Sequence, residues 1–217
     1  MKIVCLSDTH TQHHMIKVPD GDILVFAGDF AGPRDINMSQ KYTRDFAKWL
    51  DVLPHKHKII IAGNHDTAIE KDPTLAVKYF SHMNYLHNSS VTVEGLKFWG
   101  SPYTPEFCDW AFNLDRKGTA LEDCWAQIPD DTDVLITHGP PRGYLDEGGS
   151  EAHCGCSKLL DAVLKVKPQL HIFGHIHEGA GRKAFFDGTT FINASIVDTY
   201  NQPYSEPVVI NIGEDND

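Results

Sequence analysis

Residues 170–178, LHIFGHIHE, place two histidines directly after a short apolar run. Gly174 ends the run, and His175 and His177 follow with a single isoleucine between them. Short runs rich in Ile, Val and Phe are typical of strands that are buried on both faces. The stretch therefore predicts a buried strand that carries two imidazoles at its carboxyl end.

Similar apolar runs recur along the chain, each bounded by turn residues. They cover residues 3–6, 23–27, 59–62, 134–136, 170–173, 191–192 and 208–212. Helical patterns lie between them: apolar residues repeat at three and four over 42–53, Thr119 and Glu122 form a potential capping box, and Ser157 opens and caps a further helix. Strands that alternate with helices predict an α/β sandwich, and FDGT at 186–189 predicts a late antiparallel hairpin.

The composition is that of an ordinary globular protein, with 41% hydrophobic and 23% charged residues among 217. This length fits one domain, which we place at residues 1–217. The net charge of −11 disfavours a binder of long nucleic acid, although bound cations would still attract a small anionic substrate. No apolar run predicts a membrane span or a signal peptide. Five cysteines, an odd number, favour reduced thiols and a cytoplasmic location.

Candidate ligands follow five of these apolar runs. In chain order they are Asp8 and His10, then Asp29, then Asn64 and His65, then His138, and finally His175 and His177. In open α/β sheets, ligands bind beyond the carboxyl ends of the strands. We therefore expect these side chains to converge on one rim of the fold, although they are far apart in the sequence.

The chemistry of this set points to transition metals. It is too rich in histidine for Mg²⁺ or Ca²⁺, and it lacks the thiolates of a structural zinc site. Mixed nitrogen and oxygen ligands suit Mn, Fe, Zn, Co or Ni. Seven ligands with one shared carboxylate suit two ions, and two ions a few ångströms apart are typical of phosphoester hydrolysis. No serine or cysteine lies in the pattern G-x-S-x-G that would indicate a nucleophile elbow.

The motifs SDTH, AGD, GNHD, THG and GHIH occur in this order and resemble those of the calcineurin-like metallophosphoesterases. The stretches SPYTPEFCDWAFN, THGPPRGYLD, FGHIHEGAG and DGTTFINAS are similar, more closely, to the branch called metallophosphoesterase-domain-containing proteins. The resemblance covers nearly the whole chain. It implies a four-layer α/β/β/α sandwich of two mixed sheets flanked by helices, and phosphodiesterase activity on small nucleotide-type substrates.

The same resemblance implies a role for each candidate residue. One metal would be held by Asp8, His10 and His177, the other by Asn64, His138 and His175, with Asp29 bridging both. The two ions would be divalent, most simply Mn²⁺, and a water or hydroxide between them would be the nucleophile. His65 would lie outside the metals and would stabilise the phosphoryl group or protonate the leaving oxygen, with Asn64 also near the substrate.

Two details separate this chain from related enzymes. Phosphoprotein phosphatases of this superfamily carry GDxxDR, whereas this chain reads GDFAGPRD, so Arg34 is displaced and precedes the aspartate. This difference disfavours a protein phosphatase. Some members of the closer branch lose the first histidine of the last motif, but His175 is present here, and we expect a complete second metal site.

Several interpretations stay open at this point. A phosphomonoesterase, a nuclease or a non-catalytic scaffold could use the same fold, and the sequence does not set the oligomeric state. Trp110, Phe112 and Asn113 could form a base-stacking wall or belong to the core. HCGC at 153–156 is favoured as a structural loop over a metal site, and residues 214–217 are expected to be a solvated end.

Overall fold

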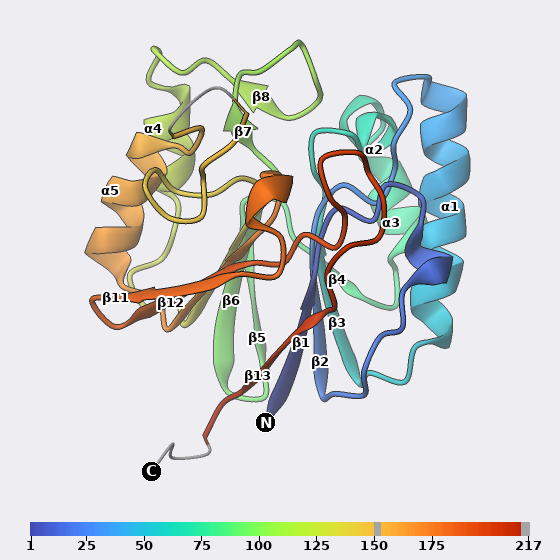
Figure 1. Ribbon diagram of the computed structural model, residues 1–217, viewed down its shortest axis with the longest axis horizontal. Helices are drawn as coiled ribbons and strands as arrows, with labels where there is room; N and C mark the ends of the chain where they lie inside the picture. The colour runs from blue at the N-terminus through green and yellow to red at the C-terminus, as the bar shows by residue number, and fades with distance from the viewer. Residues whose placement is uncertain (150–152, 214–217) are drawn as a thin grey trace.

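The computed structural model describes residues 1–149 and 153–213, so the expected solvated end at 214–217 lies outside the described residues. Two large β-sheets stack face to face, with helices on both outer sides (Figure 1). The strands are β1 (Lys2–Leu6), β2 (Ile23–Ala27), β3 (His57–Ile61), β4 (Asn84–Tyr85), β5 (Ser89–Val93), β6 (Leu96–Ser101), β7 (Thr104–Pro105), β8 (Asn113–Leu114), β9 (Val134–Thr137), β10 (Leu170–Phe173), β11 (Lys183–Phe186), β12 (Thr189–Asn193) and β13 (Val208–Asn211). The helices are η1 (His13–Met15), α1 (Ile36–Val52), α2 (Thr67–Lys71), α3 (Thr74–Tyr79), α4 (Ala120–Trp125), α5 (Ser157–Val166) and η2 (His177–Gly179).

Both large sheets are mixed. The first has the order β13-β1-β2-β3-β4, in which only β13 is antiparallel to its neighbour. The second has the order β11-β12-β10-β9-β6-β5, with antiparallel pairs at its two edges. The parallel strands therefore point their carboxyl ends toward one rim, where ligand sites of α/β sheets form.

Alternation along the strands explains the layers. On β1, Val4 and Leu6 pack toward the helices on the outer face, whereas Ile3 and Cys5 pack toward the other sheet. Both sets are fully buried, so the strands read as continuous apolar runs. Three apolar clusters result: one under α1–α3, one between the sheets and one under α4 and α5. The predicted α/β/β/α sandwich is confirmed.

In helix α1, the sequence determines both the start of the helix and the face that packs on the first sheet. Its cap is Asp35, whose Oδ1 accepts from the backbone N–H of Met38 at 2.9 Å. Phe46 and Leu50 are then one turn apart on the same face and are fully buried against the first sheet. Among the described residues, no helix is long and apolar enough to cross a bilayer.

Some local predictions were wrong. The Thr119 side chain makes no capping bond, because Thr119 itself has helical backbone angles. Helix α5 begins at Ser157 as expected, but its cap is Cys156, whose Sγ accepts from Leu159 N at 3.4 Å. The hairpin between β11 and β12 forms as predicted, with Asp187 and Gly188 in the left-handed region that such a turn requires.

The stretch around HCGC forms a loop built on Asp146. The carboxylate of Asp146 accepts from His153 Nδ1 at 2.9 Å and from Gly155 N at 3.1 Å, while its carbonyl accepts from Cys154 N at 2.9 Å. These bonds place Cys156 at the start of α5. The contacts fit the structural interpretation of HCGC.

Candidate metal centre

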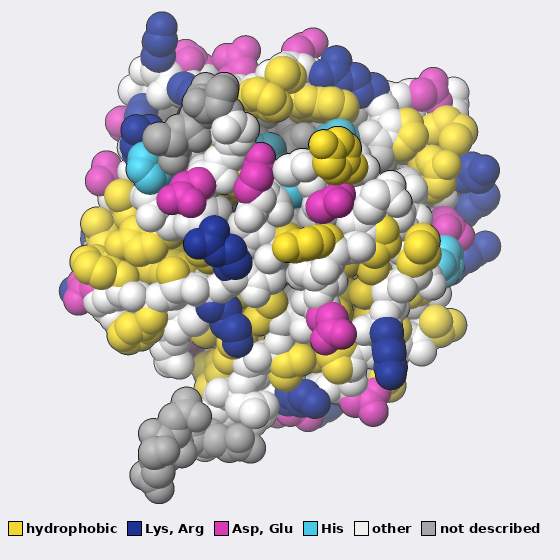
Figure 2. All heavy atoms as spheres, viewed as in Figure 1, with side chains coloured by type: hydrophobic (Ala, Val, Ile, Leu, Met, Phe, Trp, Pro, Cys, Tyr) yellow, Lys and Arg dark blue, Asp and Glu magenta, His cyan; other side chains and the backbone are white. Residues whose placement is uncertain are grey.

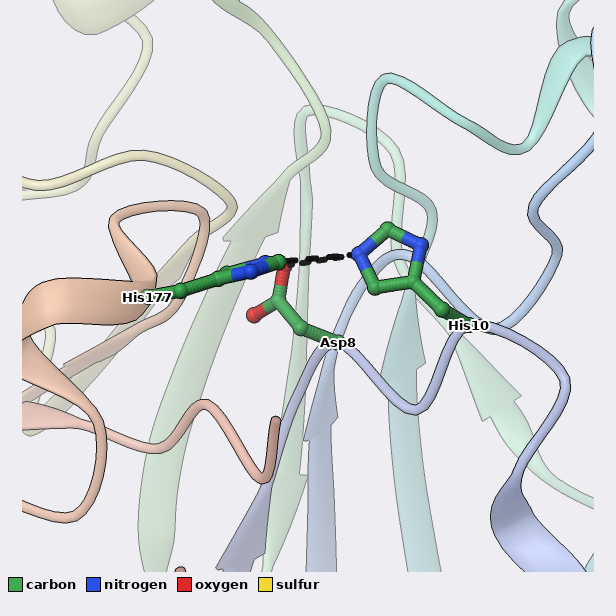
Figure 3. Close-up of side chains that lie close together, drawn as sticks. All are labelled: Asp8, His10 and His177. Carbon is green, nitrogen blue, oxygen red and sulfur yellow. Dashed lines mark hydrogen bonds and ion pairs between the residues drawn. The ribbon is translucent and has the colours of Figure 1, made fainter. Parts of the chain in front are cut away.

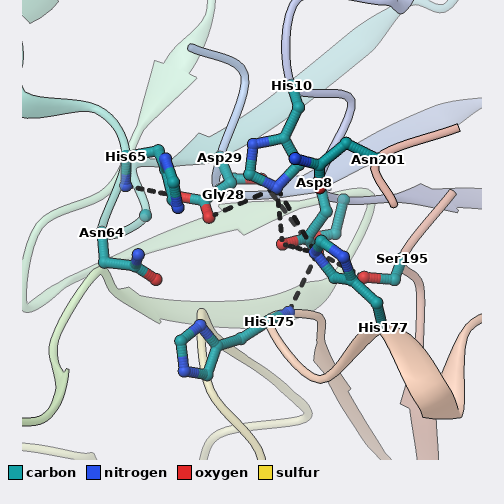
Figure 4. A network of polar contacts seen from close by, with 12 residues as sticks. Asp8, His10, Gly28, Asp29, Asn64, His65, His175, His177, Ser195 and Asn201 are labelled. Carbon is teal, nitrogen blue, oxygen red and sulfur yellow. Dashed lines mark hydrogen bonds and ion pairs between the residues drawn. The ribbon is translucent and has the colours of Figure 1, made fainter. Parts of the chain in front are cut away.

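The predicted ligands come together at the rim where strands of both sheets end (Figure 4). Three of them, Asp8, His10 and His177, form one group, and their candidate ligand atoms lie within 4.8 Å of one another. Asp29, His138 and His175 form a second group by the same measure, and Asn64 Oδ1 lies 2.8 Å from His138 Nε2. The structure thus brings all seven predicted ligands into one cluster.

Asp8 lies between the two imidazoles of the first group (Figure 3). Its Oδ1 is 3.4 Å from His177 Nε2 and 3.9 Å from His10 Nε2, and the two Nε2 atoms are 3.3 Å apart. Asp29 connects the groups, because its Oδ2 is 3.8 Å from His10 Nε2 and 3.3 Å from His138 Nε2.

The backbone around these ligands is unusual. Asp8, His10, Asp29 and His175 all have positive φ, between 41° and 70°. Such angles are uncommon outside glycine and concentrate at functional sites. Because they occur directly after strands, they turn each side chain from the strand direction into the rim.

Glycines in three motifs make room for the ligands. A Cβ on Gly174 would lie 2.0 Å from Asp8 Oδ2, and a Cβ on Gly63 would lie 2.3 Å from Asp29 Oδ1. Gly28 has a φ of +96°, and a Cβ added to it would lie 2.7 Å from His138 Nδ1. Close packing of the carboxylates and imidazoles therefore requires glycine at positions 28, 63 and 174.

Outer hydrogen bonds fix the orientation of the imidazoles. His138 Nδ1 donates to Ala27 O at 2.9 Å, and His177 Nδ1 donates to Asp198 O at 3.0 Å. A carbonyl only accepts, so the proton lies on Nδ1 and Nε2 faces the other ligands. This arrangement is typical of metal-ligating histidines.

Three supporting residues were not predicted as site residues, although Asp66 ends the GNHD motif and Asn193 and Ser195 lie in the stretch FINAS. Ser195 Oγ donates to Asp8 Oδ2 at 2.7 Å, across 187 positions of the chain. Asn193 Nδ2 donates to Ile176 O at 2.7 Å and holds the turn between His175 and His177. Asp66, the last residue of GNHD, accepts from the backbone of Asp29 at 2.9 Å and of Gly63 at 2.7 Å. Their contacts are long-range or inside a tight loop, and no periodic pattern marks them.

The buried carboxylates have no ordinary counter-ion. Asp8 and Asp29 are 0% and 1% exposed, and within residues 1–149 and 153–213 neither pairs with Lys or Arg. Burial alone raises the pKa of Asp8, but the close approach of His177 and the charge of His138 outweigh it and lower that pKa overall. Asp8 Oδ1 also has no hydrogen-bond partner in the part of the chain described. A buried anion of this kind calls for cations.

The imidazoles fit the same requirement. Burial lowers the pKa of His10 to about 4 and that of His175 to about 3, so both are neutral and offer lone pairs. Burial also opposes the charge on His138, but Asp29 prevails and raises the pKa of His138 to about 9. A proton on His138 Nε2 lies between oxygens of Asp29 and Asn64. A metal cation could take the place of this proton. The donor set fits divalent transition metals.

His65 lies at the edge of the cluster. Its backbone N–H donates to Asp29 Oδ1 at 2.7 Å, and its Nδ1 donates to Gly32 O at 2.8 Å, which leaves Nε2 unprotonated in the neutral ring. The ring packs on Trp110 with centroids 4.0 Å apart. The guanidinium of Arg34 lies 3.8 Å from the centroid of the same indole and donates to Cys108 O at 2.5 Å.

A small cavity of about 140 Å³ opens over the cluster. Its lining comprises His10, Asp29, Asn64, His65, Phe107, Trp110, His175, His177 and Asn201. Histidine side chains are visible in a hollow between hydrophobic ones on this face (Figure 2). Trp110 thus borders the site, whereas Phe112 is 2% exposed within the core and Asn113 bonds to Thr104 and Phe107. Only one of the three residues considered for a stacking wall lines the cavity.

This architecture, two mixed sheets with a rim of nitrogen and oxygen ligands, defines a metallophosphoesterase. The model of the calcineurin-like phosphoesterase family matches residues 1–179. The chain is 40% identical over 237 residues to "Metallophosphoesterase domain-containing protein 1" of Homo sapiens, covering 97% of this chain and 71% of that protein. The chain therefore belongs to the calcineurin-like phosphoesterase family, whose members are metal-dependent phosphoester hydrolases.

Solved structures share the fold at low sequence identity. A phosphopantetheinyl hydrolase of Mycobacterium tuberculosis superposes with a TM-score of 0.59 at 18% identity, over 95% of both chains. An archaeal phosphodiesterase superposes with a TM-score of 0.50 at 17% identity, over 97% of this chain and 100% of the other. The predicted resemblance and the predicted fold are both confirmed.

Proposed function

We propose that the protein is a dinuclear-metal-dependent phosphodiesterase that hydrolyses small nucleotide-type diesters, cyclic or linear. The observation that carries this proposal is the lining of the cavity, which includes no Lys or Arg among the described residues. A phosphodiester carries one negative charge, whereas a monoester carries up to two near neutral pH. A site without a cationic side chain suits the less charged substrate, and Phe107 and Trp110 offer an apolar wall for its organic group.

The metal ligands in this proposal follow the two groups at the rim. Asp8, His10 and His177 would hold one ion, Asn64, His138 and His175 the other, and Asp29 would contribute to both. We propose Mn²⁺, with Fe, Zn, Co or Ni as alternatives for the same donors. When bound, the ions would activate water as the nucleophile and neutralise charge on the phosphoryl oxygens.

His65 and Asn64 would act on the substrate. Because Gly32 O holds the Nδ1 proton, His65 Nε2 must gain a proton before it can stabilise a phosphoryl oxygen or protonate the leaving oxygen. Packing on Trp110 restricts the ring to one orientation above the cluster. The Asn64 amide group lines the same cavity.

Arg34 supports the choice against a protein phosphatase. Its guanidinium lies on Trp110 and bonds to the backbone of Cys108, and Arg34 is not among the described residues that line the cavity. The arginine is therefore engaged outside the pocket.

A side-by-side assay tests the proposal. Protein reconstituted with Mn²⁺ is given bis-p-nitrophenyl phosphate and p-nitrophenyl phosphate, with a metal-free sample as control. We expect metal-dependent turnover with a clear preference for the diester. Preference for the monoester would establish the phosphomonoesterase alternative, because both reactions use the same metal ligands.

The remaining alternatives have separate tests. A scaffold need not retain two ions, so metal content of the purified protein distinguishes it from an enzyme. A nuclease would cleave long DNA or RNA, which the net charge of −11 disfavours. We also propose a reducing, cytoplasmic environment, which the free thiols of Cys5, Cys108, Cys124 and Cys156 support.

A further inference from the structure

A second histidine cluster lies away from the candidate centre, between η1 and α1. The short η1 helix packs against α1 (Figure 1). His13 Nε2 and His14 Nε2 both approach the same oxygen, Asp45 Oδ2, at 3.3 Å and 3.1 Å. None of the three residues lines the cavity over the dinuclear cluster.

The distances match those between ligands of one metal ion. A tetrahedral Zn²⁺ with bonds of about 2.0–2.1 Å keeps neighbouring donor atoms about 3.3 Å apart. The two Nε2-to-Oδ2 distances are close to this value, and the three candidate ligand atoms all lie within 4.8 Å of one another. The two imidazole nitrogens, which lie within 4.8 Å of each other, would have to be about 3.3 Å apart around a tetrahedral ion.

His13 is a preformed part of this cluster. Its side chain is 0% exposed and packs on Phe46 and Trp49 of α1, with ring centroids 5.5 and 5.4 Å apart. Its Nδ1 is buried and has no hydrogen-bond partner among the residues described. In the metal-free protein the acceptor-only carboxylate of Asp45 keeps the proton on His13 Nε2. Because no group bonds to Nδ1 among the residues described, the proton can move there and leave the Nε2 lone pair for a cation.

His14 and Asp45 complete the cluster from the solvent side. Their side chains are 60% and 48% exposed, which gives an ion and its water ligands access. Asp45 has no Lys or Arg partner in residues 1–149 and 153–213, and burial lowers the pKa of His13 to about 4. The Asp45 carboxylate therefore faces a neutral imidazole of His13. A cation bound to Asp45 would not be repelled by a positive charge on His13.

We propose that His13, His14 and Asp45 form a third metal site, which binds one divalent transition-metal ion such as Zn²⁺. The ion would join η1 to α1. The segment that connects β1 to η1 also carries His10. In the same segment, the Gln12 side chain donates to the carbonyl of Asn201, and Asn201 lines the cavity. A bound ion would hold this loop against the first helical layer and stabilise the fold.

Zinc stoichiometry tests the site without relying on activity. The chelator-stripped full chain is titrated with Zn²⁺ in competition with a chromophoric chelator. His14→Ala and Asp45→Asn, both at exposed positions, should each bind one equivalent fewer than the wild type. In each variant the affinity of this site for Zn²⁺ should fall by more than roughly 10–100-fold, which is the loss caused by mutating a residue that only hydrogen-bonds to a metal ligand. His82→Ala, an exposed histidine outside the cluster, should match the wild type.

A second readout isolates the new site from the dinuclear centre. In Asp29→Ala, whose dinuclear centre should be lost, added Cu²⁺ should give an electron paramagnetic resonance spectrum with splitting from two nitrogens. Adding His14→Ala should reduce this to one. Equal zinc stoichiometry in wild type, His14→Ala and Asp45→Asn would overturn the proposal, as would a copper spectrum that His14→Ala leaves unchanged. Either result would mean that the cluster is a surface ion pair only.

Discussion

Among the described residues, Asp29 is the carboxylate with an oxygen that faces imidazole nitrogens of both groups of candidate ligands. Its Oδ2 faces His10 and His138, and its Oδ1 is held by the backbone of His65. Its φ of 61° is a further sign that the chain is bent to place this side chain. At the scale of single residues, Asp29 is therefore the point at which the centre is most vulnerable.

We expect Asp29→Ala to lose both ions of the dinuclear centre, because neither group of ligands keeps its shared carboxylate. Turnover should fall to that of the metal-free control. Metal analysis after gel filtration, corrected for the third site with the His14→Ala background, measures the loss. Two tightly bound ions in this corrected sample would falsify the bridging role.

His65→Ala should separate binding of metal from chemistry. The variant removes the imidazole but keeps the backbone N–H that bonds to Asp29, so two ions should remain. Turnover should fall by about 10²–10⁴-fold, the usual contribution of a positioned acid or base. Unchanged turnover with unchanged metal content would remove His65 from the mechanism.

At the scale of elements, the turns after the strands decide the geometry. The turn after β10 carries Gly174, His175 and His177, and His175 N donates to Asp8 Oδ2 at 2.9 Å. Gly174 allows Asp8 and Ser7 to approach the backbone closely, since a Cβ there would lie 2.0 and 2.1 Å from their side-chain oxygens. This turn is thus packed directly against a ligand from the other sheet.

Gly174→Ala should therefore weaken metal binding although no ligand residue is replaced. The added methyl group must displace Asp8, so we expect at least one ion to be lost, together with diester turnover. Gly32→Ala is the matched control, because its Cβ would meet only Thr11 Cγ2 at an ordinary 3.6 Å. Equal metal affinity in the two variants, measured by chelator competition, would contradict this account.

The elements that could be predicted from the sequence differ in burial and length from those that could not. Strands such as β2 and β10 are buried on both faces, and their uniform apolar runs identify them. Edge strand β5, SSVTV, is half-exposed, and helix α2 has five residues, too few for a helical period. These shorter or more polar elements take their structure from neighbours.

In the candidate site, too, some residues could be predicted from local sequence patterns and others could not. Its predicted ligands lie directly after buried strands, where an abrupt change from apolar to polar residues is visible. Ser195 supports Asp8 across 187 positions, and no local pattern encodes such a contact. Trp110 looked like either core or pocket, and it borders the cavity while its ring packs on His65.

At the scale of the whole molecule, the buried histidine His171 on β10 affects acid stability. The Thr137 hydroxyl donates to Gly139 O at 2.7 Å, so it accepts from His171 Nε2–H at 2.8 Å. His171 Nδ1 is buried without a partner among the described residues, and burial lowers the pKa of His171 to about 3. The imidazole is therefore held neutral in the folded state.

This depressed pKa sets the direction of a pH effect. The unfolded chain takes up a proton on His171 near pH 6.5, but the folded chain does not, so folding stability falls as the pH drops from about 6.5 toward 3. His171→Gln keeps an N–H donor for Thr137 and cannot be protonated. Between pH 7 and 5, metal-free wild type should lose up to about 2 kcal/mol more than this variant in urea unfolding. Parallel pH profiles would contradict the assignment.

The rim brings together residues that are far apart in the sequence and are therefore synthesised at different times. His10 and His177 are 167 positions apart, and β1 pairs with β13 as well as with β2. At roughly 5–20 residues per second, the ribosome makes His177 about 8–33 s after His10. A nascent chain that already shows Asp8, His10 and Asp29 therefore has only fragments of either ion's coordination. Complete coordination of either ion must therefore wait until His175 and His177 have been made, so the ions that the protein acquires are those offered to a chain that has already formed β10.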